Sequence, residues 1–272
     1  MASHRVLVAD PISEHGVALL NEHPDITADF IPDLGSQPEK LLEIIGDYDA
    51  LIVRSQTKPT AEVIARGSRL QAIGRAGVGV DNIDREAASA HGVIVMNTPT
   101  GNTVSTAEHA FALMLATARN IAPAHAEVLQ GNFKAARKAF AGIELNGKRL
   151  AVIGMGRIGS EFVRRAQGFN MKVVAFDPFL TQARADELKI ELAESPDAAL
   201  TRADVVTLHV PLTDDTRHII NSERLALMNK GALVVNCARG GLIDEEALKV
   251  AIDSGHIAGC ALDVYEDEPP AA

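Results

Sequence analysis

Short apolar runs alternate along the chain with longer stretches in which apolar residues recur every three or four positions. An apolar run of four to seven residues without alternation is typical of a strand buried on both faces of a parallel sheet. The three-to-four spacing is typical of an amphipathic helix. The pattern therefore predicts parallel sheets covered by helices. The expected strands are residues 5–9, 26–31, 50–53, 70–74, 93–97, 150–153, 171–176, 204–210, 231–237 and 257–262.

The strands form two βα series, and a stretch rich in turn-forming residues, Thr98-Pro99-Thr100-Gly101-Asn102, follows the first series. Such composition marks a loop between periodic segments. We expect an α/β fold with two doubly wound parallel-sheet domains, one over residues 1–98 and one over residues 99–272.

A long helix is predicted over residues 103–121, and it is apolar around nearly its whole circumference. A helix of this kind is buried from more than one side, either between domains or between subunits, although an ordinary core helix fits the periodicity equally well. Helical periodicity continues over residues 124–139, where Lys134, Arg137 and Lys138 give a basic face.

Composition narrows the class of protein. A length of 272 residues suits one large or two ordinary domains, and 47% hydrophobic residues suffice for buried cores. No apolar run reaches the length of a membrane span, and the first residues lead directly into a strand without a signal-peptide pattern. A net charge of −10 argues against nucleic acid or an anionic membrane as a partner. The two cysteines lie in apolar strand patterns, so we expect free thiols and a cytoplasmic location.

The most informative stretch follows the strand at 150–153. Gly154, Gly156 and Gly159 have G-x-G-x-x-G spacing, Arg157 and Ile158 fill the gap, and a helical pattern continues to residue 168. The glycines of this pattern permit a tight turn, a close approach to a pyrophosphate, and close helix–strand packing. The next strand ends at Asp177, where a carboxylate can accept both ribose hydroxyls and repels a 2′-phosphate. We therefore predict NAD rather than NADP; the alternative is a βαβ unit without a ligand.

Ligands of doubly wound sheets bind beyond the carboxyl ends of the strands. Arginines close three of the apolar strands here: Arg54, Arg75 and Arg239. A guanidinium at such a position suits a carboxylate or phosphate, and the set favours an anionic small-molecule substrate, although any one arginine could form a structural ion pair.

Several motifs together resemble those of the D-2-hydroxyacid dehydrogenases over essentially the whole chain. The motifs are residues 75–84 (RAGVGVDNID), 97–102 (NTPTGN), 105–109 (STAEH), 154–159 (GMGRIG), 208–212 (LHVPL), 236–244 (NCARGGLID) and 261–264 (ALDV). Arg54 and Arg75 resemble the branch of this family that oxidises D-3-phosphoglycerate to 3-phosphohydroxypyruvate in serine biosynthesis. The resemblance implies a flavodoxin-like substrate domain and a Rossmann NAD domain.

The resemblance also implies roles for individual residues. Arg239 would hold the substrate carboxylate and the developing carbonyl oxygen, and Glu268 would orient a catalytic histidine. The implied substrate-binding residues are Arg54, Ser55, Arg75, Gly77 and Asn102. The implied cofactor-binding residues are Val78, Gly154, Gly156, Arg157, Ile158, Gly159, Asp177, Val210, Pro211, Cys237, Ala238 and Asp263. No metal site is expected.

The sequence departs from the family in one respect. A catalytic histidine in a Pro-His-x-Gly pattern should follow Glu268, and none of the nine histidines fits that pattern. We expect the family's last strand and the segment that returns to the first domain to be missing too. The 272-residue chain should then bind NAD, oxidise phosphoglycerate poorly, and expose an apolar strip on its first domain.

Two other functions remain open. One is a broader 2-hydroxyacid or 2-ketoacid reductase acting on glyoxylate or hydroxypyruvate, and the other is a non-catalytic NAD-responsive binding protein. In each case we expect a homodimer through the region 103–121, with a tetramer as a further possibility.

Overall fold

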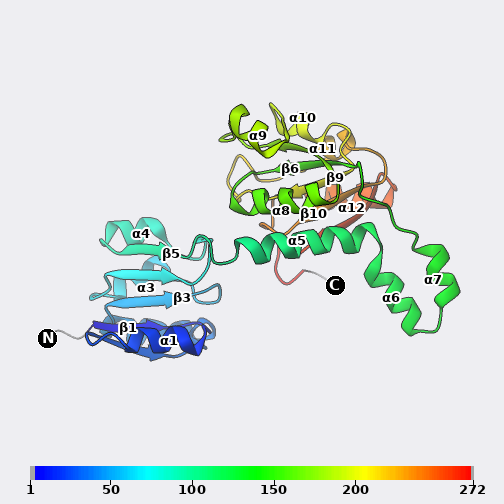
Figure 1. Ribbon diagram of the computed structural model, residues 1–272. Helices are drawn as coiled ribbons and strands as arrows, with labels where there is room; N and C mark the ends of the chain where they lie inside the picture. The colour runs from blue at the N-terminus through cyan, green and yellow to red at the C-terminus, as the bar shows by residue number, and fades with distance from the viewer. Residues whose placement is uncertain (1–3, 271–272) are drawn as a thin grey trace. The chain divides into compact units, whose positions relative to one another are not determined.

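The computed structural model describes residues 4–270 and divides the chain into two compact units between Asn102 and Thr103. Each unit is built on one parallel sheet with flanking helices (Figure 1). The boundary predicted from composition, between residues 98 and 99, falls a few residues earlier, within the loop before the long helix. All paired strands in both sheets run parallel, and helices connect them. The predicted α/β fold with two parallel sheets is therefore confirmed.

The first unit contains a five-stranded sheet in the order β2-β1-β3-β4-β5. This is the flavodoxin-like order 2-1-3-4-5, with a reversal of strand order between β1 and β3. Its strands are β1 (His4–Val8), β2 (Ile26–Phe30), β3 (Ala50–Val53), β4 (Ala72–Arg75) and β5 (Ile94–Asn97). Its helices are α1 (Glu14–Asn21), α2 (Pro38–Ile44), α3 (Ala61–Arg66) and α4 (Arg85–Ala90), with short 3₁₀ turns at Leu34–Ser36 and Ile45–Asp47.

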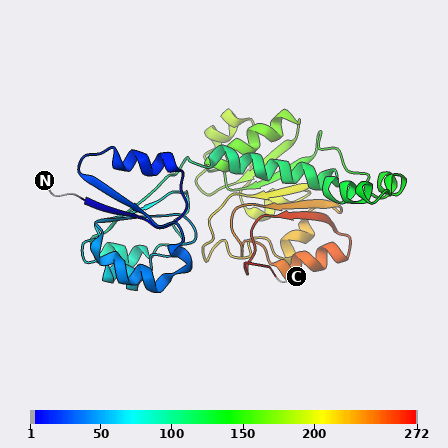
Figure 2. The ribbon, with the colours of Figure 1, turned by 90° about the horizontal axis from the view of Figure 1, so that it is seen from below.

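The two faces of the first sheet are covered unequally. One face packs against α2, α3 and α4 around the buried residues Leu51, Ile64 and Ile73. The other face carries α1, which has no buried residue (Figure 2). On β5, the side chains of Ile94 and Met96 are 62% and 53% exposed. The apolar strip predicted on the first domain is therefore present.

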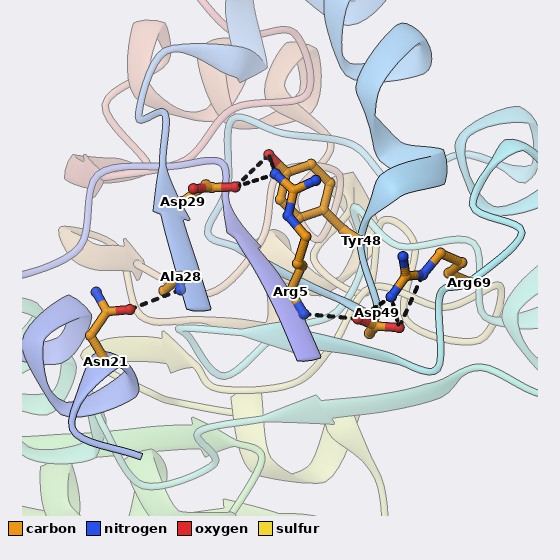
Figure 3. Close-up of polar contacts among 7 residues, drawn as sticks. All are labelled: Arg5, Asn21, Ala28, Asp29, Tyr48, Asp49 and Arg69. Carbon is orange, nitrogen blue, oxygen red and sulfur yellow. Dashed lines mark hydrogen bonds and ion pairs between the residues drawn. The ribbon is translucent and has the colours of Figure 1, made fainter. Parts of the chain in front are cut away.

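Polar side chains near the amino-terminal ends of β1, β3 and β4 bond to one another and to Asp29 on β2 (Figure 3). Asp49 accepts a 2.8 Å hydrogen bond from the backbone N–H of Arg5 and pairs with Arg69 at 3.1 Å. The Arg5 guanidinium lies 4.5 Å from the ring centre of Tyr48 and pairs with Asp29. The hydrogen bond from the Arg5 backbone, followed by that from Arg69, lowers the pKa of Asp49, and hydrogen bonds from Arg5 and Tyr48 lower the pKa of Asp29. This network lies at the end of the sheet opposite the candidate ligand edge.

The second unit contains a six-stranded sheet in the order β11-β10-β9-β6-β7-β8. Numbered from β6, this is the Rossmann order 3-2-1-4-5-6 read from the β8 edge, with its switch point between β6 and β9. The strands are β6 (Arg149–Ile153), β7 (Lys172–Phe176), β8 (Glu191–Leu192), β9 (Val205–Leu208), β10 (Ala232–Asn236) and β11 (Ile257–Leu262). The helices after β6 are α8 (Arg157–Gly168), α9 (Gln182–Leu188), α10 (Pro196–Leu200), α11 (Ser222–Leu227) and α12 (Glu245–Asp253).

Three helices precede β6: α5 (Thr103–Ala118), α6 (Ile121–Leu129) and α7 (Phe133–Ala139). Helix α5 packs on α8, β10 and β11 and buries one face, which includes Ala107, Phe111 and Met114. The prediction of unbroken helix over 124–139 is wrong, because α6 and α7 are separate helices and Gly131 between them has a φ of +83°. In both ribbon views α6 and α7 lie beyond the end of α5, away from the sheet (Figures 1 and 2).

Local signals in the sequence position several helix ends. The side chains of Thr60, Asp84, Asn221 and Asp244 each accept a hydrogen bond from a backbone N–H in the first turn of the following helix. Both cysteines are free thiols, as expected. Between residues 4 and 270, no helix combines the length and the apolar character that crossing a membrane would require.

Candidate functional site

At the carboxyl edge of the first sheet, the switch point between β1 and β3 is organised by a buried carboxylate. Asp10, which is fully buried, follows β1 and accepts a hydrogen bond from the backbone N–H of Arg54, which follows β3. The carboxylate also accepts bonds from the backbone N–H and the hydroxyl of Thr57, at 3.1 Å and 2.6 Å. Asp10 therefore fixes the turn that carries Arg54 and Ser55.

Arg54 and Arg75 lie at the ends of neighbouring strands. In the β3–β4 register Val53 is opposite Arg75, and the Nε of Arg75 donates to the backbone carbonyl of Arg54 at 3.2 Å. The Arg54 guanidinium donates to the carbonyl of Pro11 at 3.2 Å. Two guanidinium groups at adjacent strand ends, on a chain of net charge −10, form a local cationic region.

The loop after β4 is held by backbone and amide contacts. The side chain of Asn97 donates to the carbonyl of Val78 at 2.6 Å, and the N–H of Thr98 donates to the carbonyl of Gly77. A Cβ on Gly77 would lie 2.5 Å from a terminal nitrogen of Arg75, so glycine lets the guanidinium fold over this loop. Asn102 is exposed at the end of the first unit. The structure thus places Arg54, Ser55, Arg75, Gly77 and Val78 at one sheet edge.

In the second unit the glycine loop joins β6 to α8 at the switch point. Gly154 has a φ of +98°, and a Cβ there would lie 2.6 Å from the carbonyl oxygen of His209 after β9. A Cβ on Gly159 would lie 2.2 Å from the carbonyl oxygen of Gly154. Gly156 differs, because no atom lies within 4 Å of its hypothetical Cβ. Gly154 and Gly159 are therefore required by the fold, whereas Gly156 leaves open space over the start of α8.

Helix α8 begins without a side-chain cap, with Gly156 at the capping position. Its first N–H groups are thus available to an anion, and the helix dipole adds positive potential at this end. Arg157 is exposed at the helix start, while Ile158 packs against the core. The arrangement suits a diphosphate held by backbone N–H groups.

Asp177, at the end of β7, is aimed at this loop. One carboxylate oxygen accepts a 2.7 Å bond from the backbone N–H of Met155, and the other accepts a 2.8 Å bond from that of Phe179. A carboxylate has about four lone-pair sites, so acceptor capacity remains on both oxygens for the hydroxyls of a ribose. The open space at Gly156 and the position of Asp177 together fit NAD.

The segment after β9 forms the other side of the switch point. The ring of His209 packs on Phe162 with ring centres 5.2 Å apart, and its Nε2 lies 3.1 Å from the Thr207 hydroxyl. Burial lowers the pKa of His209 to about 4, so the imidazole is neutral at pH 7. Val210 is partly buried and Pro211 is exposed, with its carbonyl accepting from the hydroxyl of Thr216.

Asn236, which is buried at the end of β10, holds the turn after that strand through hydrogen bonds of its side chain. Its side chain accepts from the N–H of Ala238 at 3.0 Å and donates to the carbonyl of Arg239 at 2.8 Å. The Arg239 guanidinium donates to the carbonyl of Ala238 at 2.6 Å. A Cβ on Gly240 would lie 1.7 Å from the carbonyl oxygen of Tyr265, so only glycine fits beside the segment after β11.

Cys237 and Asp263 follow adjacent strands β10 and β11, and His109 lies across from them on α5. The Nε2 of His109 is 3.3 Å from a carboxylate oxygen of Asp263. Burial, with a smaller contribution from Asp263, raises the pKa of the Cys237 thiol to about 12. This thiol is protonated at pH 7.

Glu268 lies beyond β11 and is exposed. One oxygen accepts a 3.2 Å bond from the backbone N–H of Tyr265. The nearby Glu266 pairs with the imidazole of His218, and its backbone N–H donates to a carboxylate oxygen of Glu245 at 2.8 Å. Among the hydrogen bonds and ion pairs of residues 4–270, none joins Glu268 to a histidine.

Three residues that shape the site were not singled out as site residues from the sequence, although Asn82 and Asn236 lie inside the motifs 75–84 and 236–244. Asp10 reads as an ordinary turn residue before a proline, and Asn236 as the last residue of a strand. Asn82 donates to the carbonyls of Arg54 and Thr57, at 2.9 Å and 2.7 Å, and so links β3 to the loop after β4. A polar residue at the end of an apolar strand was the available signal for Asp10, and for Asn236 its place in the motif 236–244 was a second signal.

The second unit, with its Rossmann strand order, glycine loop and Asp177, defines an NAD-binding protein of the dehydrogenase type. Residues 111–272 match the family described as D-isomer specific 2-hydroxyacid dehydrogenase, NAD binding domain. The chain belongs to this family, as the motifs predicted.

The chain is 49% identical over 266 residues to a D-3-phosphoglycerate dehydrogenase of Methanocaldococcus jannaschii, covering 98% of this chain and 50% of that protein. It therefore spans about half the length of this relative. It is 43% identical over 272 residues to a hydroxypyruvate reductase of Thermotoga maritima, covering 99% of this chain and 85% of that protein. A glyoxylate reductase structure from Paecilomyes thermophila superimposes with a TM-score of 0.86 at 33% identity, covering 100% of this chain and 84% of that one.

Proposed function

We propose that this chain belongs to an NAD-dependent dehydrogenase that oxidises D-3-phosphoglycerate to 3-phosphohydroxypyruvate. The observation that carries the proposal is the placement of Arg54 and Arg75 at adjacent strand ends, with Arg75 bonded to the backbone of Arg54. Two guanidinium groups can bind a phosphate dianion through several charge-assisted hydrogen bonds. The relative from Methanocaldococcus jannaschii, which is named for this activity, supports the same substrate.

NAD, when bound, supplies a nicotinamide ring that accepts a hydride. The backbone N–H groups at the start of α8 would hold its diphosphate, and Asp177 would accept hydrogen bonds from its adenosine ribose. Val78, Val210, Pro211, Cys237, Ala238 and Asp263 are the remaining residues proposed to contact the cofactor. A carboxylate at the ribose also disfavours the additional phosphate of NADP, because like charges at hydrogen-bonding distance repel.

Arg239 would bind the substrate carboxylate and the oxygen on C2. The Asn236 side chain fixes the backbone on both sides of Cys237 and Ala238, so the arginine projects from a rigid turn. Its fixed positive charge stabilises the negative charge that gathers on the C2 oxygen as the hydroxyl proton leaves. Arg54 and Arg75, with Asn102 and Ser55, would bind the phosphate. Gly77 is a further proposed substrate contact, and its backbone N–H donates to the carbonyl of Arg75 at 2.8 Å in this structure.

The 272-residue chain should oxidise the substrate slowly, because none of its histidines lies in the Pro-His-x-Gly pattern expected of the general base. General base catalysis contributes about 10²–10⁴-fold to the rate of such reactions. His209 is neutral and mostly enclosed, and the imidazoles of His109 and His218 pair with Asp263 and Glu266. Glu268, proposed to orient a catalytic histidine, accepts a hydrogen bond from the backbone N–H of Tyr265. The substrate is therefore tested best by binding.

The experiment compares D-3-phosphoglycerate with D-glycerate by calorimetry, using the 272-residue chain saturated with NADH. The two compounds differ only in the phosphate, and each hydrogen bond to a charged group contributes about 1.5–3 kcal/mol. We expect glycerate to bind at least ~10-fold more weakly, since ~1.4 kcal/mol is a factor of ten. Equal affinities would contradict the proposed substrate.

A broader reductase acting on hydroxypyruvate or glyoxylate is the second candidate. It is favoured by the 43% identity to the hydroxypyruvate reductase, of which this chain covers 85%. Binding of hydroxypyruvate in the same assay as tightly as phosphohydroxypyruvate would favour this function, because the arginines would then contribute nothing to affinity.

We further propose that the chain forms a homodimer through the region 103–121, which covers α5 and the start of α6, and that α6 and α7 extend this surface. Large apolar side chains are exposed there, with Leu129 and Phe133 at 74% and 56%. Exposed apolar residues grouped on neighbouring helices typically mark an interface between proteins. Light scattering should give twice the chain mass of 28.9 kDa, and Leu129→Asp with Phe133→Asp should reduce it to one chain. A monomeric wild-type chain would contradict the proposal.

A further inference from the structure

His109, Cys237 and Asp263 form a cluster with the geometry of a metal site. The imidazole nitrogen, the sulfur and a carboxylate oxygen all lie within 4.8 Å of one another. In a tetrahedral zinc site with bonds of about 2.0–2.3 Å, neighbouring ligand atoms are about 3.3–3.6 Å apart. The nitrogen and a carboxylate oxygen are 3.3 Å apart already, and the sulfur lies within 4.8 Å of both ligand atoms.

The three residues come from different parts of the sequence and are held by the packed core. His109 is on α5, and this helix packs on β10 and β11, the strands that precede Cys237 and Asp263. Rigid elements of this kind hold ligand atoms in place before a metal arrives. Because these residues are far apart along the chain, no metal site was expected from local motifs.

The exposure of the three side chains suits an ion that enters from solvent. The side chains of His109 and Asp263 are 51% and 53% exposed, while Cys237 is 8% exposed and forms the floor. Three protein ligands below and solvent above leave a fourth position for water. Thiolate and imidazole donors select zinc over magnesium and calcium, which prefer oxygen ligands.

We propose that His109, Cys237 and Asp263 bind Zn²⁺. The thiol proton of Cys237 is displaced into solvent as the zinc–sulfur bond forms, while the imidazole and carboxylate donate lone pairs. Because Cys237 and Asp263 are also proposed cofactor contacts, bound zinc would exclude NAD from this edge. Only this exclusion rests on the proposed function.

Cobalt is the probe that tests the site, since Co²⁺ adopts zinc geometries and gives a thiolate-to-cobalt absorption band. Co²⁺ is titrated into the metal-free 272-residue chain, and Zn²⁺ is then added to displace it. We expect the band in the wild type and its loss in His109→Gln, Asp263→Asn and Cys237→Ala. His109→Gln changes an exposed side chain and should leave folding intact, which circular dichroism checks.

Two matched variants serve as controls. Cys260→Ala removes the other free thiol, and His91→Gln removes an exposed imidazole on the first unit; both should keep the band. No band in the wild type, or a band that persists in Cys237→Ala or His109→Gln, would overturn the site.

The exclusion of NAD is measured separately by titrating NADH with and without one equivalent of Zn²⁺. We expect NADH to bind at least ~10-fold more weakly when zinc is present, a change of ~1.4 kcal/mol. Equal NADH affinity with and without zinc would overturn the exclusion. If the metal-free chain fails to bind NADH, the proposed function fails, and the cobalt spectra still decide the metal site.

Discussion

The carboxylate of Asp177 accepts a 2.7 Å hydrogen bond from the backbone N–H of Met155, which lies inside the glycine loop. This bond joins the end of β7 to the turn between β6 and α8, so the acidic side chain and the phosphate-binding backbone are parts of one rigid unit. A carboxylate positioned in this way also presents negative charge where NADP would place its additional phosphate.

Gly156→Ala should weaken NADH binding without changing stability. No protein atom lies within 4 Å of the added Cβ, so the methyl group should occupy only the space proposed for the diphosphate. We expect a loss of about 10-fold or more in NADH affinity, equivalent to ~1.4 kcal/mol, measured by calorimetry. Gly168→Ala is the matched control, because its Cβ also meets no atom and it lies at the far end of α8. Equal losses in both variants would argue against diphosphate binding at Gly156.

Arg54→Gln should reduce affinity for D-3-phosphoglycerate while leaving NADH affinity unchanged. The substitution removes one charged partner of the proposed phosphate, which costs about 1.5–3 kcal/mol, or roughly 10–100-fold in affinity. Calorimetry with the NADH-saturated chain measures the loss. Arg66→Gln, an exposed arginine at the end of α3 that pairs with Glu62, is the control. Full phosphoglycerate affinity in Arg54→Gln would remove the main support for the proposed substrate.

His209 should make the second unit less stable in mild acid. Its pKa is about 4 in the folded chain, below its ordinary value of 6.5, because burial disfavours the charged imidazole. The unfolded chain therefore takes up a proton first, and stability falls as the pH drops from about 6.5 towards 4. At pH 5.5 the cost is about 1 kcal/mol relative to pH 8. Urea unfolding of wild type and His209→Gln should show that excess loss only in the wild type; parallel losses would contradict a neutral buried imidazole.

Asp49→Asn should destabilise the first unit at neutral pH. The charged acceptor for the Arg5 backbone and for Arg69 is lost, at a cost of about 1–2 kcal/mol. The folded-state pKa of Asp49 is lowered, so its stabilisation is present above the ordinary pKa of about 4 and is lost as the pH falls through the folded pKa. Thermal unfolding should separate wild type from variant at pH 7 and bring them together in strong acid. Asp33→Asn, at an exposed position, should match the wild type throughout.

Local patterns sufficed to predict most of the fold. Strands without polar alternation, such as Ala50–Val53, are typical of a parallel sheet with helices on its faces, although in the first unit one face is covered less completely. Cap residues such as Asp84 and Asp244 place helix starts to within a residue. The break between α6 and α7 was missed because apolar periodicity continues on both sides of Gly131, and β8 is too short to give a pattern.

The parts of the candidate site that lie within one short sequence motif could be predicted, whereas the parts formed by residues far apart along the chain could not. The glycine loop and Asp177 share one βαβ unit, so their spacing alone indicates a dinucleotide. The bonds of Asp10 to Arg54 and Thr57 span more than forty residues, and the grouping of His109 with Cys237 spans more than a hundred. Such contacts depend on strand order, which local periodicity does not determine.

Binding of NADH and NADPH to the 272-residue chain, measured by calorimetry under matched conditions, tests the NAD site most directly. The account predicts that NADH binds and that NADPH binds at least ~10-fold more weakly, with the gap closing in Asp177→Ser but not in the surface variant Asp186→Asn. Equal binding of the two dinucleotides by the wild type, or no binding of either, would contradict it.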